Sequence, residues 1–153
     1  MPHLGNLISG LRQINISRTQ KLFRYELFLR SYNSPDWNNF VNYQKINEFQ
    51  KNLVHRDLDF EIFLINWPID YQSKIHNHSE NGCLLKVLKG NLLENIYHPN
   101  LELLDSKKRY THQISYLDDS IGYHNVQNID TTNSVSMHIY SPPYHSTQYF
   151  SNI

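Results

Sequence analysis

Two histidines separated by one residue, His76 and His78, form the pattern in this sequence with the clearest potential for chemistry. On an extended segment, side chains two positions apart point to the same side, so both imidazoles can reach one metal ion. His124 lies in a later segment and would complete a set of three. Three neutral imidazoles suit iron, zinc, copper or nickel. The histidine pair alone is a weak signal, because surface histidines are common and short motifs give false matches.

A second pattern is an alternation of polar side chains late in the sequence. Ser136, His138 and Tyr140 are spaced two apart, and apolar residues stand between them. If this segment is a strand, all three side chains face the same way. Burying three polar side chains on one face is costly unless they have hydrogen-bond partners. The alternation therefore favours a functional role over simple packing.

The spacing after the histidine pair resembles that of the cupin superfamily. Cupins show two histidines one residue apart, then three or four residues, a glutamate, six residues and a glycine. Here Cys83 follows His78 after four residues, and Gly90 follows Cys83 after six. The second cupin motif is matched by Gly122, His124 and Asn128. The resemblance implies a cupin barrel with a metal in its mouth, in which Cys83 takes the place of the usual glutamate ligand.

The cysteine at this position makes the sequence similar to one family in particular, cysteine dioxygenase. The similarity covers roughly residues 37–147, and its motifs occur in order at 51–54, 73–92, 119–128 and 136–143. It implies a mononuclear non-haem iron enzyme with Fe(2+) as its cofactor. Such an enzyme adds both atoms of O2 to the thiolate of L-cysteine and produces cysteine sulfinate. The implied partners are a small thiol and O2, and the family is usually monomeric.

The resemblance also implies roles for individual residues. His76, His78 and His124 match the iron ligands, and Cys83 matches a cysteine that forms a thioether with the tyrosine at Tyr140. The alternative is that Cys83 is a buried small apolar residue, as free cysteines often are. On the later strand, the family pattern implies that Ser136 orients His138 and that His138 orients the Tyr140 hydroxyl. Trp67 also matches a family position, where we expect it to pack at the barrel rim.

One substrate-binding position departs from the family. The arginine that holds the substrate carboxylate is replaced by Lys51, and the tyrosine before it by Phe49. Arginine grips a carboxylate with two parallel hydrogen bonds, whereas lysine acts as a point charge. Lys51 could hold cysteine more weakly, Arg56 could take its place, or the substrate could be another thiol such as 3-mercaptopropionate or cysteamine. The alternative without catalysis is a metal-binding cupin, which would not need the polar strand.

The elements that must position these residues fall into two parts. The first part is expected to be helical: residues 17–32 have apolar residues at helical spacing with Ser17 as N-cap, and Ser34 with Pro35 opens a second helix. From residue 48 the period changes to two. Strands are expected at 48–54, 59–67, 83–88, 91–97, 101–104, 113–117, 123–128 and 135–140. The fold prediction is mainly β: a single cupin domain over 1–153, with a helical cap at about 1–47 and a double-stranded β-helix, or jelly-roll barrel, at about 48–150.

Composition excludes several classes of function. Lys and Arg total 14 and so do Asp and Glu, which argues against binding to nucleic acid, because that needs clustered positive charge. The apolar runs are too short to span a membrane, and the N-terminal residues lack the cationic and apolar regions of a signal peptide. The single cysteine rules out an internal disulfide. A cytoplasmic location is therefore expected.

Overall fold

A computed structural model describes residues 3–14 and 20–151 of the chain. The helical part contains α1 (Leu4–Gln13) and α2 (Glu26–Ser31), together with the 3-10 helices η1 (Leu22–Tyr25), η2 (Pro35–Phe40) and η3 (Tyr43–Lys45). The single helix expected over 17–32 is instead η1 followed directly by α2, and its expected cap Ser17 lies outside the described residues. Ser34 does cap η2, because its hydroxyl accepts a hydrogen bond from the backbone N–H of Asp36. The N-terminal helix α1 lies within the helical cap expected at about 1–47, although no separate helix was predicted there; it buries Leu4, Leu7 and Leu11.

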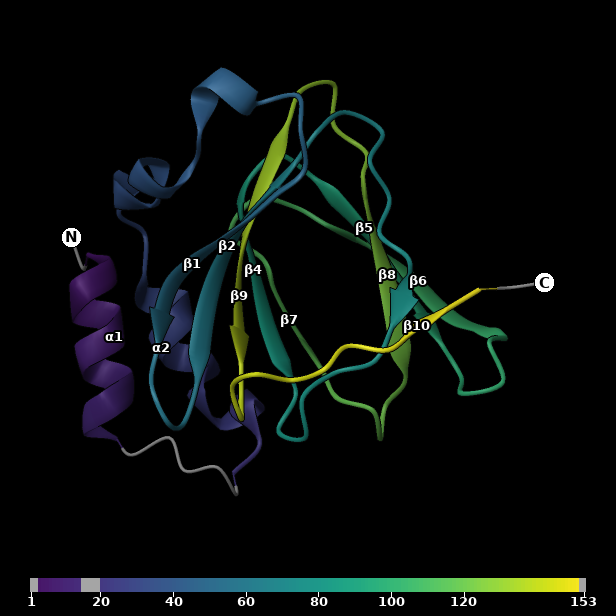
Figure 1. The fold of residues 1–153 in the computed structure, drawn as a ribbon, viewed down its shortest axis with the longest axis horizontal. Coiled ribbons are helices and arrows are strands. Elements are labelled where there is room, and N and C mark those ends of the chain that lie inside the picture. The colour runs from purple at the N-terminus through teal and green to yellow at the C-terminus, as the bar shows by residue number, and fades with distance from the viewer. Residues whose placement is uncertain (1–2, 15–19, 152–153) are drawn as a thin grey trace.

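Residues 3–14 and 20–151 contain ten strands, which form two five-stranded sheets in which each paired neighbour is antiparallel. The first sheet has the order β1-β2-β9-β4-β7, and the second has the order β10-β3-β8-β5-β6. Figure 1 shows the chain crossing repeatedly from one sheet to the other, with the helical part on the outer side of the first sheet. The strand bounds are β1 (Gln50–Arg56), β2 (Glu61–Trp67), β3 (Ile75–His76), β4 (Cys83–Lys89), β5 (Leu92–Tyr97), β6 (Leu103–Arg109), β7 (Ile114–Leu117), β8 (Tyr123–Asn128), β9 (Ser134–Tyr140) and β10 (Tyr149–Phe150). The predicted class, mainly β with a helical N-terminal part, is confirmed.

Two strand predictions differ from the structure. The strand expected at 101–104 is β6, which begins later and runs to Arg109. This strand lies at the edge of its sheet and is largely exposed on both faces, so its sequence has no apolar alternation to mark it. The turn expected at 55–58 lies at Asp57–Phe60 instead. There the Asp57 carboxylate accepts hydrogen bonds from the backbone N–H groups of Asp59 and Phe60, and β1 continues past a bulge to Arg56.

The three central strands of the first sheet, β2, β9 and β4, are buried on both faces, and the two faces differ in chemistry. On β9, Met137 and Ile139 belong to the apolar cluster that includes the helices. The alternate residues Ser136 and His138 point to the other face, toward the second sheet. A second apolar cluster lies there, deeper in the barrel, formed by Ile65, Trp67, Leu85, Val87, Leu92 and Val126. The helical part therefore covers one face of the sheet, and the chemistry-bearing side chains occupy the opposite face.

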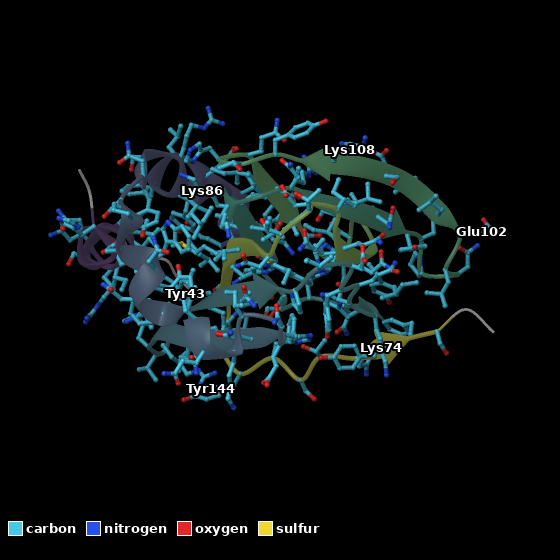
Figure 2. All side chains as sticks on the ribbon, turned by 90° about the horizontal axis from the view of Figure 1, so that it is seen from above. Tyr43, Lys74, Lys86, Glu102, Lys108 and Tyr144 are labelled. Atoms are coloured by element: carbon cyan, nitrogen blue, oxygen red, sulfur yellow. The ribbon has the colours of Figure 1, made fainter. Side chains whose placement is uncertain are left out.

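Lys86 connects the helical part to the first sheet. Its side chain lies on β4 with only 2% exposure, and Figure 2 labels it beside the helices. Its ammonium donates hydrogen bonds to the backbone carbonyls of Leu29 and Arg30, at 3.0 and 3.4 Å, and to that of Tyr32. These carbonyls lie at the C-terminal end of α2, where few backbone donors remain; among the described residues, only that of Leu29 also accepts a bond from a backbone N–H, that of Tyr32. Among the described residues, no helix is long and apolar enough to cross a membrane.

Candidate metal centre and active site

The three histidines of the predicted set converge at one point between β3 and β8. His76 on β3 and His124 on β8 are directly opposite each other in the sheet, and His78 lies just beyond the end of β3. One ring nitrogen from each residue lies within 4.8 Å of the other two. Nε2 of His76 is 3.1 Å from Nε2 of His124. The structure thus brings these three imidazoles into the arrangement that a metal ion requires.

The other ring nitrogen of each histidine faces an oxygen acceptor. An acceptor at Nδ1 fixes the ring proton there and leaves Nε2 with a bare lone pair, which is the atom a metal binds. The acceptors are the Lys74 carbonyl for His76 at 2.7 Å, the Asp119 carboxylate for His78 at 3.2 Å and the Glu94 carboxylate for His124 at 2.7 Å. All three Nε2 lone pairs are therefore directed into the same space.

The electrostatics of this cluster also fit a bound cation. Burial lowers the pKa of His76 to about 2 and that of His78 to about 4, so both rings are neutral at physiological pH. Nε2 of His78 is buried and has no hydrogen-bond partner among the described residues. A buried polar atom without a partner is costly, and a coordinated metal would satisfy it. The donor set of three neutral imidazoles suits a divalent transition metal.

The candidate metal centre opens into a cavity of about 380 Å³, a size that holds a small molecule. The cavity lies between the two sheets and extends toward the segment that follows β9. Its walls carry His76 and His124 from the second sheet and His138 and Tyr140 from the first. Two lysines, Lys51 and Lys74, line it as well, together with aromatic residues such as Phe49, Trp67, Tyr71 and Tyr149.

The alternating residues of β9 form the predicted hydrogen-bonded chain. Ser136 Oγ is 2.7 Å from Nε2 of His138, and Nδ1 of His138 is 3.1 Å from the Tyr140 hydroxyl. Packing at the barrel rim, the role expected for Trp67, is only part of what this residue does. Trp67 is 2% exposed and its indole N–H donates to Ser136 Oγ at 2.8 Å. The chain therefore has four members and begins on β2.

The direction of the hydrogen bonds in this chain follows from its first member. An indole N–H can only donate, so Ser136 accepts from Trp67, and we assign the one proton of Ser136 to its other hydrogen-bond partner, Nε2 of His138. Burial holds the pKa of His138 well below its usual value, so the ring is neutral. Because Nε2 accepts the bond from Ser136, the one ring proton lies on Nδ1. His138 then donates to the Tyr140 oxygen. This arrangement leaves the Tyr140 O–H free to donate to an acceptor other than His138.

Cys83 and Tyr140 are neighbours across the sheet. They are direct partners in the β4–β9 register, and Cys83 Sγ lies 3.8 Å from Nδ1 of His138. Burial is the main cause that raises the pKa of both the thiol and the phenol, and a hydrogen bond links the two groups. Cys83 is thus a buried thiol in contact with polar groups rather than one surrounded only by apolar side chains.

Lys51 and Arg56 occupy different environments. Lys51 is exposed as a residue, but its ammonium lies 4.6 Å from the centre of the Phe63 ring and 5.3 Å from that of Tyr140. Partial loss of water there lowers the pKa of Lys51. Arg56 instead pairs with Glu61 at 2.7 Å, and the described residues that line the cavity do not include it. Of these two residues, the structure therefore places Lys51, and not Arg56, at the cavity wall.

Sequence reasoning missed the two carboxylates behind the histidines. Glu94 points inward on β5 beside Leu92 and Ile96, where an acidic residue on the apolar face of a strand was the available signal. Asp119 also accepts a hydrogen bond from the backbone N–H of His78 at 2.9 Å. His145, which follows the family motif at 136–143, lines the cavity and lies 3.0 Å from the amide oxygen of Asn77.

Comparison with known proteins agrees with this geometry. The family model for cysteine dioxygenase type I matches residues 5–153. The sequence is 32% identical over 158 residues to cysteine dioxygenase type 1 of Danio rerio and 31% identical over 157 residues to that of Homo sapiens. Each match covers 96% of this chain and 78% of the relative.

Solved structures show the same fold at low sequence identity. A protein with a double-stranded β-helix domain from Klebsiella pneumoniae superposes with a TM-score of 0.61 at 11% identity, over 75% of this chain and 94% of the other. A cupin superfamily protein from Desulfitobacterium hafniense gives 0.51 at 8% identity, over 62% and 78%. The cupin fold predicted from the sequence is confirmed. The relatives support a metal-dependent dioxygenase that uses a small-molecule substrate and O2, and the chain belongs to the cysteine dioxygenase type I family.

Proposed function

We propose that the protein is an Fe(2+)- and O2-dependent thiol dioxygenase that converts L-cysteine to cysteine sulfinate, with His76, His78 and His124 as the iron ligands. The observation that carries this proposal is the convergence of one ring nitrogen from each of the three histidines, beside a cavity lined by His76, His124 and Tyr140. Bound iron would supply a site for the thiolate and for activation of O2. The reaction balances without an external reductant, because the sulfur atom of the substrate supplies the electrons that reduce O2. Both oxygen atoms end in the sulfinate.

The charge of the proposed ligand set suits an anionic substrate. Three neutral imidazoles add no negative charge, unlike a set of two histidines and one carboxylate. A divalent ion held by them keeps its full positive charge and favours the thiolate over the thiol. The low pKa values of His76 and His78 keep these ligands unprotonated across the physiological range.

The chain from Trp67 to Tyr140 would hold a phenol proton at a fixed place beside the reacting groups. Ser136 and His138 are positioning residues in this proposal, and Tyr140 is the member at the cavity wall. We further propose that Cys83 and Tyr140 become joined by a thioether. That bond requires removal of the thiol hydrogen and one ring hydrogen, with the two electrons taken up by O2. Their opposite positions on β4 and β9 support it.

Lys51 is proposed to bind the substrate carboxylate. Its ammonium lies at the cavity wall, where it has lost part of its contact with water. A substrate carboxylate would replace these lost interactions. This role favours cysteine or 3-mercaptopropionate over cysteamine, which has no carboxylate. Cys83 favours cysteine, because relatives that act on 3-mercaptopropionate usually lack the cysteine that forms the thioether. A metal-binding cupin without catalysis would not need the ordered chain on β9.

The remaining proposals concern the state of the protein in the cell. We propose that residues 1–153 act as one domain and as a monomer. A cytoplasmic location is proposed because a reducing compartment keeps the Cys83 thiol available for the thioether bond.

Product analysis tests the proposed function. The protein is loaded anaerobically with Fe(2+) and then given O2 with L-cysteine, 3-mercaptopropionate or cysteamine, and sulfinate is detected by mass spectrometry. We expect cysteine sulfinate as the main product. Sulfinate from one of the other thiols would change the substrate and keep the reaction. Iron-loaded protein that forms no sulfinate from any of the three would overturn the proposal.

A further inference from the structure

The three proposed ligands differ in what lies behind their Nδ1 atoms. The partner of His76 is a neutral backbone carbonyl. The partner of His78 is Asp119, whose side chain is 42% exposed and lies at 3.2 Å. The partner of His124 is Glu94, whose side chain is 1% exposed and lies at 2.7 Å. The shortest contact between a carboxylate and a histidine of the set is thus also the most deeply buried.

Glu94 is itself held firmly from the opposite side. Its Oε1 accepts hydrogen bonds from Arg109 Nε at 3.1 Å, from Arg109 Nη2 at 2.9 Å and from Ser115 Oγ at 2.6 Å. Its Oε2 remains for His124. The adjacent Arg109 guanidinium, paired with this carboxyl at 2.9 Å, favours its charged form. Glu94 is therefore a fully bonded carboxylate in the interior of the barrel.

We propose that Glu94 is a positioning residue for the metal centre: it fixes the ring orientation and the Nδ1–H tautomer of His124 and makes His124 the strongest of the three donors. The inference rests on the proposed function, because it assumes that the three histidines bind a metal. It assigns Arg109 and Ser115 the task of holding the carboxylate in place.

The physical basis is the electrostatic effect of an anion on the far side of an imidazole. A carboxylate that accepts the Nδ1 proton increases the electron density at Nε2 and so the strength of the bond to a metal. This effect is larger in the interior, where little water screens the charge. Asp119 is exposed, so solvent reduces its influence on His78, and the carbonyl behind His76 carries no net charge. The order of donor strength is therefore His124, then His78, then His76.

The test compares two matched substitutions. Glu94→Gln and Asp119→Asn each replace a carboxylate with an amide of the same shape, one behind His124 and one behind His78. The affinity of the apoprotein for Co(II) is measured by the absorption of the bound ion, and the affinity for Fe(2+) is measured anaerobically. We expect Glu94→Gln to weaken binding about 10- to 100-fold and Asp119→Asn to weaken it several times less. Thermal unfolding of the apoproteins tests whether both variants are folded.

The outcomes separate this inference from the proposed function. A wild-type protein that binds neither ion overturns the metal site, and the inference falls with it. If the wild type binds, a Glu94→Gln affinity equal to that of the wild type, or a larger loss for Asp119→Asn, overturns the role of Glu94 alone. If Glu94→Gln does not fold, ¹⁵N spectra of the histidines in the wild-type apoprotein decide the question. They are expected to show His124 protonated at Nδ1 and bare at Nε2, and the reverse tautomer would contradict the proposal.

Discussion

The indole nitrogen of Trp67 lies 2.8 Å from the hydroxyl of Ser136, on the neighbouring strand of the same sheet. This bond gives the polar chain of β9 a beginning and a direction. Without it, the serine hydroxyl could point either way and His138 could carry its proton on either nitrogen. With it, each donor has one acceptor, and the Tyr140 oxygen receives a hydrogen bond from His138.

Removing the first donor is expected to slow the reaction more than it weakens binding. Trp67→Phe keeps an aromatic ring and deletes the indole N–H, so Ser136 and His138 lose their fixed orientation. We expect kcat for cysteine to fall about tenfold, equivalent to roughly 1.4 kcal/mol, with KM changed less than threefold. Steady-state sulfinate formation measures both. The control is Trp37→Phe, which alters the other tryptophan, on the helical side of the sheet. Equal kcat values for Trp67→Phe and the wild type would rule out the directional chain.

The two cavity lysines provide a matched pair for testing substrate binding. Lys51→Ala should raise the KM for cysteine about 10- to 100-fold, because it removes a charge-assisted contact to the carboxylate. The KM for cysteamine, which has no carboxylate, should not change. Lys74→Ala removes the other lysine side chain and keeps the backbone carbonyl that bonds His76, so it serves as the control. An equal rise in KM for both thiols would show that Lys51 does not recognise the carboxylate.

Intact mass spectrometry tests the proposed bond between Cys83 and Tyr140. Protein that has turned over with iron, cysteine and O2 should lose the mass of two hydrogen atoms, because the thiol and the ring each give up one. Cys83→Ser should keep its full mass under the same conditions. Wild-type protein with full activity and an unchanged mass would exclude the thioether.

The buried histidines predict how the stability of the apoprotein depends on pH. Burial lowers the pKa of His138 and His78 below the value of about 6.5 that they have in the unfolded chain. As the pH falls through 6.5, the unfolded chain takes up protons that the folded chain does not. The free energy of unfolding should therefore decrease between pH 7 and pH 5, by about 1–2 kcal/mol for each such group.

Urea denaturation at the two pH values measures this difference. His138→Asn should show a smaller decrease than the wild type, because one of the buried groups is gone. His98→Asn, at an exposed position, should leave the decrease unchanged. Wild-type apoprotein that is equally stable at both pH values would contradict the buried neutral state of these rings.

The parts of the site that were predictable lie within short stretches of sequence. The pair His76 and His78 and the alternation on β9 both follow from the period of two in an extended chain, which holds whatever the partners of the strand are. The matched family motifs added His124 and Cys83. Local patterns of this kind identify side chains that share a face without requiring the rest of the fold.

The parts that were missed depend on contacts between strands. Glu94 reaches His124 from the adjacent strand, and Trp67 reaches Ser136 in the same way, and no local pattern encodes which residues become opposite each other. The edge strand β6 lacks apolar alternation, so its start was placed too early. Strand pairing, and not local propensity, decided each of these differences.

The two faces of β9 also affect how the protein can change over evolution. Met137 and Ile139 belong to the same apolar cluster as the helices, and the residues that alternate with them form the polar chain, so one backbone carries both sets. A substitution in the helices that shifts this strand by a fraction of an ångström moves His138 and Tyr140 with it. The helical part contributes none of the proposed catalytic or ligand residues, yet natural selection on the reaction extends to its packing. Directed evolution of substrate range or rate should therefore yield beneficial mutations in the helices as well as in the cavity.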